Sequence, residues 1–514
     1  MQRLYKYISS QVPFLVIGTL LCTIIDSLFY IFVENKFDRG FLVIGANFMM
    51  TLGMVFIMMI LAVFKADKAI RYVFMFIISL YVCLLAFCWA KFGNTIDKGM
   101  IALINGTNPQ EMSEFFSVYV TVPSILLMLF AVFVVFNAFL FLIRVMHSAG
   151  KKQMIAVGVF FVFGCCCLGF SFYTIPGRIE AIFRTQKKNL AEYLHHPVMT
   201  PTRNAHPDVV MLVIGESHVR SHSSLYGYDK LTSPRLAKLR DNGNLICFSQ
   251  AVSPATHTAE SFKYFMTTCN SAEDEKPWYE CLTIPEAVQC AGFNTAWISN
   301  QAYSGWHDNV SASFADLCQT MFYAKEKGSE ELIAFPDEVL FPLVEKYMDK
   351  QVSDGTRHCV FINLMGQHQA YDKRYPRQWE KFKPSYYAAK PENQRTEYAS
   401  YDNACLYNDY VVDSLFSTLR DRNAVAVYFP DHGQDFYVSA PDYCSHSNDS
   451  NPVSYQAGIQ IPLVVYMSEK YRATHADVER KLRDMSRKPF NTTNMLMLVL
   501  YLTGYSTKEV KELR

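Results

Sequence analysis

The chain contains 514 residues with a formal net charge of +1, and 51% of its residues are hydrophobic. This length is too great for one ordinary domain, and the hydrophobic fraction is high for a soluble protein. The net charge of +1 says nothing about nucleic acid, and we expect no nucleic-acid partner.

Apolar segments near the N-terminus predict five transmembrane helices. Each segment has the roughly 20 apolar residues that a helix needs to cross a bilayer. The first does not read as a signal peptide, because more spans follow it and no small-residue cleavage site is evident. The segments cover residues 12–33, 41–64, 69–92, 117–146 and 154–175.

The loops between these spans predict their orientation, because cytoplasmic loops carry an excess of Lys and Arg. Bases precede the first span, separate the second from the third, and separate the fourth from the fifth. They are Arg3, Lys6, Lys65, Lys68, Arg71, Arg144, Lys151 and Lys152. An odd number of spans then places everything after residue 175 on the outer side of the membrane.

A polar loop, residues 104–116, lies between the third and fourth spans on the expected outer side. Its polar cluster consists of Asn105, Thr107, Asn108 and Glu111, close to the lipid headgroups. From its composition alone, a solvated loop is the simpler interpretation.

Residues 177–199 carry apolar residues at roughly helical spacing among bases. This pattern suits a helix that lies on the membrane surface, and a plain connecting helix is the alternative. Prolines at 197, 201 and 207 then mark a linker. The sequence therefore divides into a transmembrane domain, a bridging helix with its linker, and an exported domain, at residues 1–176, 177–204 and 205–514.

The exported domain begins with an apolar strand that ends in a carboxylate. Residues 209–214 form a continuous apolar run, which is typical of a parallel strand buried on both faces. Gly215 lets the chain turn, and Glu216 follows at the carboxyl end of the strand. Ligands of open α/β sheets bind at that edge.

Three further apolar segments also end in polar residues, and helix-length segments separate them. These ends carry Asp431 with His432, then His368, and then Ser299, Asn300 and Gln301. The pattern predicts an α/β domain with a mainly parallel sheet that has one polar edge.

Two of these strand ends together offer a metal site. Glu216, Asp431 and His432 supply carboxylate and imidazole groups, which suit zinc. Residue 431 follows Pro430, where the chain has left the strand, so both of the later side chains can turn toward one ion. Taken singly, each residue could instead be a helix-capping acid or a loop histidine.

The segment SPATHTAESF, residues 253–262, supplies hydroxyl groups that such a metal could activate. A threonine hydroxyl is a poor nucleophile at neutral pH unless a cation stabilises its alkoxide. Thr258 precedes an expected helix, whose N-terminus favours an incoming phosphate, although a simple N-cap is also consistent. The residues alone leave Thr256, Thr258 and Ser261 open.

The eight cysteines outside the spans are an even number in an exported domain, which favours disulfides. Cys269 and Cys281 flank a polar loop and are the first choice for a pair, but eight cysteines allow 105 pairings and the sequence does not choose among them. The absence of a CxxC motif argues against a structural cysteine zinc site. The eight are Cys247, Cys269, Cys281, Cys290, Cys318, Cys359, Cys405 and Cys444.

Six motifs occur in the order GESHVRSHSSLYGY, HTAES, WISNQ, LMGQHQAYDKRYP, YDNACLYNDY and PDHG. Behind five spans, this series resembles the phosphoethanolamine transferases of the alkaline phosphatase and sulfatase superfamily, over essentially the whole chain. These bacterial inner-membrane enzymes modify lipid A or the lipopolysaccharide core. The SLYGY form is closer to the core-modifying and broad-substrate branches than to the branch known from transferable polymyxin resistance.

The resemblance implies an N-terminal five-helix transmembrane domain and a periplasmic C-terminal α/β domain like that of alkaline phosphatase. It also implies transfer of phosphoethanolamine from phosphatidylethanolamine to lipid A or the lipopolysaccharide core, at a phosphate or a sugar hydroxyl. We expect the protein to be a monomer. The acceptor group and the number of zinc ions are left open.

The family pattern assigns roles to residues. Zinc would be bound by Glu216, Asp431, His432 and Thr258, and Thr258 would also be the nucleophile that carries phosphoethanolamine. The catalytic histidines would be His368 and His446, in contact with the phosphate or a second zinc. The cluster of Asn105, Thr107, Asn108 and Glu111 resembles the segment that lines the lipid donor site, which replaces the solvated-loop interpretation.

Some residues depart from the family pattern. Asn363 and Gln367 stand where relatives often have histidine and serine, and Gln434 stands where glutamate is common. His446 lacks the usual glycine after it. These differences leave the first zinc site in place and concern only a second one.

Other activities are conceivable on the same fold, such as glycerol-phosphate transfer or hydrolysis by a sulfatase-like or phosphodiesterase-like enzyme. A sulfatase needs Cys or Ser in a C/S-x-P-x-R segment, which the sequence lacks. A transporter or sensor should carry charges within its spans, where little beyond Asp26 is found.

Overall fold

The chain divides into two compact units, and the fold described below belongs to the second. The computed structural model describes residues 206–269, 278–301, 310–324, 336–351, 355–441, 443–447 and 451–505, with isolated positions between 83 and 133. The expected spans, the bridging helix and the loop of residues 104–116 lie almost wholly outside these residues. Within the described part, no helix combines the length and the apolar character needed to cross a bilayer.

A seven-stranded sheet forms the centre of the described domain, in the order β2-β10-β7-β1-β6-β4-β5. All its pairings are parallel except those of β10, which runs antiparallel to β2 and β7. The expected mainly parallel sheet is therefore confirmed. The strands are β1 (Val209–Gly215), β2 (Leu245–Cys247), β4 (Phe293–Ser299), β5 (Thr320–Tyr323), β6 (Arg357–Asn363), β7 (Ala424–Pro430) and β10 (Val464–Met467).

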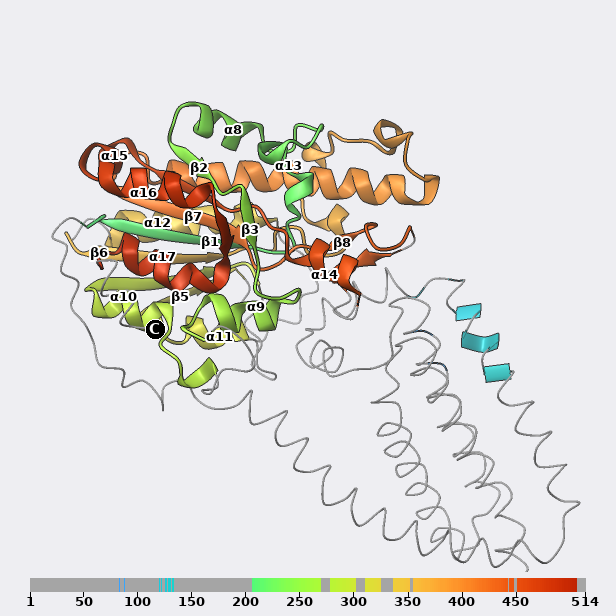
Figure 1. Ribbon diagram of the computed structural model, residues 1–514, viewed down its shortest axis with the longest axis horizontal. Helices are drawn as coiled ribbons and strands as arrows, with labels where there is room; N and C mark the ends of the chain where they lie inside the picture. The colour runs from blue at the N-terminus through green and yellow to red at the C-terminus, as the bar shows by residue number, and fades with distance from the viewer. Residues whose placement is uncertain are drawn as a thin grey trace, which may run out of the picture. The chain divides into compact units, whose positions relative to one another are not determined.

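Helices cover both faces of this sheet (Figure 1). On one face, α9, α10 and α17 pack against Val210, Leu212 and Ile214 of β1, and on the other, α8, α12 and α13 pack against Val209, Met211 and Val213. The helices are α8 (Pro234–Asp241), α9 (Thr258–Phe265), α10 (Ile284–Cys290), α11 (Val310–Ala315), α12 (Phe341–Gln351), α13 (Arg395–Ser417), α14 (Pro452–Ile459), α15 (Glu469–Thr474), α16 (Ala476–Ser486) and α17 (Met495–Leu502).

The apolar run of β1 explains its central place, because every residue of this strand is buried. The strand pairs with β6 on one side and β7 on the other, so both of its faces need helices to cover them. Its register sets Gly215 beside Pro430 and Ile214 beside both Phe429 and Asn363. The carboxyl ends of these three strands therefore meet at one edge.

Two short two-stranded sheets complete the domain. Strand β3 (Gln250–Val252) pairs with β11 (Pro489–Asn491), and β8 (Asp435–Phe436) pairs with β9 (Cys444–Ser445). The first leads into the segment that carries Thr258, and the second follows Asp431 and His432.

The expected disulfide between Cys269 and Cys281 is wrong, because the structure forms no disulfide between these two residues. A backbone bridge between Thr267 and Thr283 already joins the two segments. The amide of Cys269 turns back to the Thr267 hydroxyl at 3.1 Å. Hydrogen bonds thus connect these segments without a covalent link.

Candidate metal centre

The turn after β1 presents a buried carboxylate at the sheet edge. Glu216 is 1% exposed, and Ser217 adopts a left-handed conformation with a φ of 55°. Tyr401 of α13 holds this turn, because its hydroxyl donates to the Ser217 carbonyl at 2.7 Å and accepts the Val219 amide at 2.8 Å. The chain therefore reverses sharply and leaves Glu216 at the end of the strand.

The turn after β7 meets the turn after β1. The Asp431 amide donates to the Gly215 carbonyl at 3.1 Å, and Asp431 Oδ1 accepts the amides of Ser217 at 3.2 Å and His432 at 2.7 Å. The two turns are thus joined by hydrogen bonds in both directions. These bonds hold the Glu216 and Asp431 carboxylates in a fixed relative position.

Glu216, Asp431 and His432 form a compact set of metal-ligand groups. One ligand atom of each lies within 4.8 Å of the others. His432 Nε2 is 3.4 Å from Glu216 Oε1 and 3.4 Å from Asp431 Oδ2. His432 Nδ1 contacts the Gly433 carbonyl at 2.6 Å. A carbonyl only accepts, so Nδ1 carries the hydrogen of this contact, and Nε2 is the ring nitrogen that faces the carboxylates.

The electrostatics of this set fit a bound cation. Burial, with the nearby Asp431 charge, raises the pKa of Glu216 to about 7, and burial raises the pKa of Asp431 to about 6. Asp431 Oδ2 is buried without a hydrogen-bond partner among the described residues. Two buried carboxylates and an imidazole are a favourable zinc donor set. A cation would bind Asp431 Oδ2 and would offset the repulsion between the Glu216 and Asp431 carboxylates.

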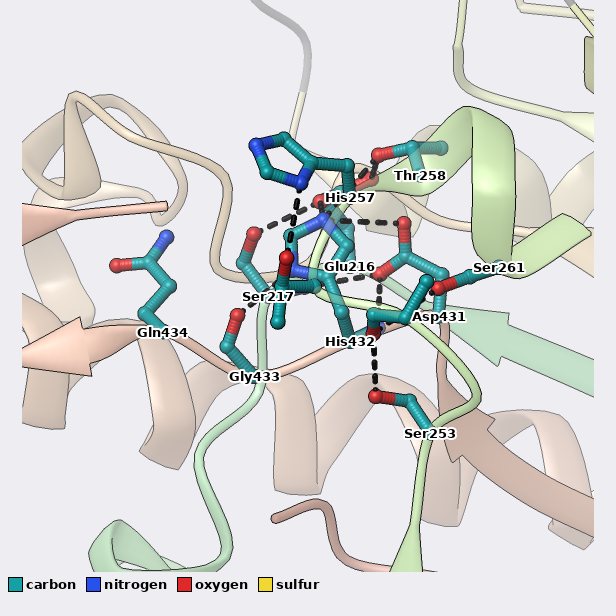
Figure 2. A network of polar contacts seen from close by, with 12 residues as sticks. Glu216, Ser217, Ser253, His257, Thr258, Ser261, Asp431, His432, Gly433 and Gln434 are labelled. Carbon is teal, nitrogen blue, oxygen red and sulfur yellow. Dashed lines mark hydrogen bonds and ion pairs between the residues drawn. The ribbon is translucent and has the colours of Figure 1, made fainter. Parts of the chain in front are cut away.

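Thr258 lies against this set at the first position of α9. Its hydroxyl is 3.4 Å from Glu216 Oε2 and 3.3 Å from His432 Nε2, and Figure 2 shows the four side chains converging. The other candidate hydroxyls have local partners. Thr256 Oγ1 contacts His257 Nδ1 at 2.9 Å, and Ser261 Oγ donates to the Ala255 carbonyl at 3.3 Å.

Histidine rings line the same site. The ring of His446 lies 5.0 Å from that of His432 and 6.4 Å from that of His368, measured between centroids. Burial lowers the pKa of His368 to about 4 and lowers that of His446 well below its ordinary value. Both rings are therefore neutral at pH 7 and can donate one hydrogen bond each.

Two residues of the site were not assigned a role from the sequence. His257, which directly precedes Thr258, stacks on His446 with centroids 5.3 Å apart. Gln301 Nε2 donates to Glu216 Oε2 at 3.3 Å and to the Leu364 carbonyl at 3.0 Å. The sequence indicated their place in the site only through their positions. His257 precedes the candidate nucleophile, and Gln301 follows the end of β4.

The residues that depart from the family pattern lie around this centre. Asn363 and Gln367 are buried, and Gln434 Oε1 accepts the Tyr371 hydroxyl at 2.5 Å. In the described part of the chain, no second group of three His, Cys, Asp or Glu side chains meets the geometry of a metal site. Asn105, Thr107, Asn108 and Glu111 lie outside the described residues.

Comparisons with known proteins agree with this architecture. A family model described as sulfatase matches residues 208–505, which is more than half of the chain. The chain belongs to the sulfatase family. A second model, described as phosphoethanolamine transferase EptA/EptB, matches residues 49–200.

Individual relatives carry the same description. Phosphoethanolamine transferase EptC of Escherichia coli strain K12 is 32% identical over 289 residues, which are 54% of this chain and 48% of that protein. The chain thus spans about half the length of the curated relatives it matches. The periplasmic domain of EptC from Escherichia coli, solved in complex with Zn, has a TM-score of 0.55 at 26% identity, covering 60% of this chain and 87% of that one.

One solved structure extends the likeness to nearly the whole chain. The integral membrane protein lipooligosaccharide phosphoethanolamine transferase A of Neisseria meningitidis has a TM-score of 0.62 and covers 98% of both chains. Its identity of 17% makes this a likeness of fold alone.

Proposed function

We propose that this chain is a zinc-dependent enzyme that transfers phosphoethanolamine from phosphatidylethanolamine to lipid A or the lipopolysaccharide core. The observation that carries this proposal is the convergence of the Thr258 hydroxyl with Glu216, Asp431 and His432. The names of the EptC and EptA relatives support the choice of phosphoethanolamine as the transferred group.

The donor set favours zinc as the metal. Glu216, Asp431 and His432 would hold the ion, and the Thr258 oxygen would be the fourth ligand, which gives the four-coordinate arrangement that zinc prefers. The complex of the EptC periplasmic domain with Zn supports this assignment. Bound zinc would stabilise the threonine alkoxide and neutralise charge on the phosphoryl oxygens.

Thr258 would act as the nucleophile in a two-step exchange. Its oxygen forms a bond to the phosphorus of phosphatidylethanolamine, the bond to the diacylglycerol oxygen breaks, and that oxygen takes up the proton that the Thr258 hydroxyl releases. Phosphoethanolamine then remains on Thr258 until the oxygen of an acceptor phosphate or sugar hydroxyl forms a bond to the phosphorus and the bond to Thr258 breaks, which restores the threonine.

The surrounding groups would orient the phosphoryl group. Thr258 opens α9, so the free amides of the helix N-terminus favour an anion beside the hydroxyl. His368 and His446 are neutral and can donate hydrogen bonds to phosphoryl oxygens.

The N-terminal part of the chain would supply the lipid. We propose that residues 1–176 form a five-helix transmembrane domain in the bacterial inner membrane, that residues 177–204 link it to the periplasmic catalytic domain, and that the enzyme is a monomer. The polar residues Asn105, Thr107, Asn108 and Glu111 would bind the donor headgroup. The match of residues 49–200 to the transferase model supports this arrangement.

Intact-mass measurement of the full chain, purified from cells that contain phosphatidylethanolamine, tests the covalent step. We expect a fraction of the protein to carry the mass of one phosphoethanolamine. The adduct should disappear in Thr258→Ala, because the attacking oxygen is gone, and persist in Thr256→Ala, whose hydroxyl contacts His257 instead. An adduct that survives in Thr258→Ala would place the nucleophile elsewhere and overturn the proposal.

A further inference from the structure

A buried carboxylate outside the metal centre binds the turn that follows β6. Asp337 begins the short helix η5 (Asp337–Leu340) and is 4% exposed. Its Oδ1 accepts the Met365 amide at 2.9 Å and the Asn300 Nδ2 group at 2.8 Å, and its Oδ2 accepts the Gly366 amide at 2.9 Å. One side chain therefore connects the ends of β4 and β6.

The turn that Asp337 binds, residues 364–368, lies directly against Glu216. The Gln367 amide donates to the Glu216 carbonyl at 2.9 Å. Gly366 has a φ of +50°, and a Cβ atom at this position would lie 2.7 Å from the Glu216 amide nitrogen. The same turn positions His368, whose amide donates to the Met365 carbonyl at 3.1 Å.

The second partner of Asp337 leads to the Glu216 side chain. Asn300 is followed by Gln301, which bridges the Glu216 carboxylate and the Leu364 carbonyl. The Asn300 amide also donates to the Asn363 carbonyl at 3.0 Å. Through its three hydrogen bonds, Asp337 thus fixes two of the segments that contact Glu216, although none of these bonds joins it to Glu216 itself.

We propose that Asp337 is a positioning residue of the metal centre. It holds the 364–368 turn and Gln301 so that Glu216 and His368 keep the geometry needed for zinc binding and phosphoryl transfer. This inference rests on the proposed zinc-dependent function. Ligand groups whose supporting hydrogen bonds are removed typically lose roughly 10–100-fold in metal affinity or activity.

The test is the Asp337→Asn variant of the full chain in detergent, with zinc affinity measured by chelator competition. An asparagine oxygen can still accept the Met365 and Asn300 donors, but its NH₂ group would face the Gly366 amide. We expect zinc affinity to fall by about 10–100-fold and kcat to fall, with KM for phosphatidylethanolamine unchanged.

Asp409→Asn is the matched control. Asp409 is also a buried carboxylate that accepts two backbone amides, those of Arg235 at 2.8 Å and Leu236 at 2.9 Å, but it serves the start of α8. It should lose thermal stability and keep wild-type zinc affinity. If Asp337→Asn does not fold, Asn300→Ala, which removes one of the three donors, should show a smaller loss of zinc affinity.

Four results would overturn the proposal. Wild-type zinc affinity in Asp337→Asn would do so directly, and wild-type affinity in Asn300→Ala would do so if only that variant folds. An equal affinity loss in Asp337→Asn and Asp409→Asn would mean that general destabilisation explains the effect. A wild-type chain that binds no zinc would overturn the proposed zinc-dependent function as well, and this outcome is distinct from the other three.

Discussion

At the scale of single residues, the pairing of Glu216 with Asp431 dominates the chemistry of the site. Both carboxylates are buried, and burial raises the pKa of each. Without a cation, the folded protein holds protons there that the unfolded chain would release. Protons and the proposed zinc ion would therefore compete for the same oxygens.

This competition predicts how the stability of the zinc-free chain depends on pH. The pKa of Glu216 rises from an ordinary value of 4.5 to about 7 on folding, so the folded state binds more protons through that interval. The free energy of unfolding should therefore fall as pH rises from about 5 to about 8, and zinc affinity should rise over the same range. Thermal melts of the zinc-free and zinc-loaded chain measure both trends.

Glu216→Gln is the control for this pH dependence, because Glu216 has the higher pKa of the two buried carboxyl groups and the substitution removes its titration. The melting temperature of the zinc-free variant should fall much less between about pH 5 and about pH 8 than that of the zinc-free wild type. A decline as steep as that of the wild type would assign the effect to other groups.

Residues next to strand ends could be predicted from the sequence, and residues placed by tertiary contacts could not. Glu216, Asp431 and His432 each follow an apolar run, so their convergence required only a parallel sheet. Asp337 contacts Met365 and Gly366 across 28 and 29 positions of sequence separation. No local sequence pattern predicts such a contact, because it depends on where η5 packs in the folded domain.

At the scale of elements, the 364–368 turn is the part of the fold that most directly fixes the site. A Gly366→Ala change should weaken zinc binding severely, because the new Cβ would lie 2.7 Å from the Glu216 amide nitrogen and 2.9 Å from its carbonyl oxygen. Neither atom can move without displacing the end of β1. Zinc titration of the variant measures the effect.

Gly355→Ala separates this contact from backbone strain. Gly355 also has a positive φ, +78°, but a Cβ atom there would meet nothing within 4 Å. It should lower stability by about 1 kcal/mol, because an L-residue is strained in the left-handed region, and leave zinc affinity unchanged. Equal zinc affinity in the two variants would contradict the role given to the turn.

The strands and the disulfide show why some elements were predictable and others were not. The buried run of β1 has no polar position, which only a strand covered on both faces tolerates, so the parallel sheet followed from composition. The pairing of Cys269 with Cys281 was inferred only from an even cysteine count and a polar loop. The backbone bridge between Thr267 and Thr283 holds the two segments together without a covalent bond.

At the scale of the whole molecule, the proposed reaction joins a lipid donor in the bilayer to a metal centre in the exported domain. The described domain contains the proposed nucleophile and the proposed metal ligands, whereas the residues proposed to bind the donor belong to the N-terminal part of the chain. The central claim is therefore that Thr258 and a zinc ion act together on a membrane lipid.

Transfer of label from phosphatidylethanolamine vesicles to the protein tests this claim most directly. The full chain would be incubated with headgroup-labelled lipid, with zinc or after chelation, and the labelled residue located by peptide mass mapping. The account predicts label on Thr258 that appears with zinc and is lost on chelation. Label on another residue, or labelling that is unchanged by chelation, would contradict it.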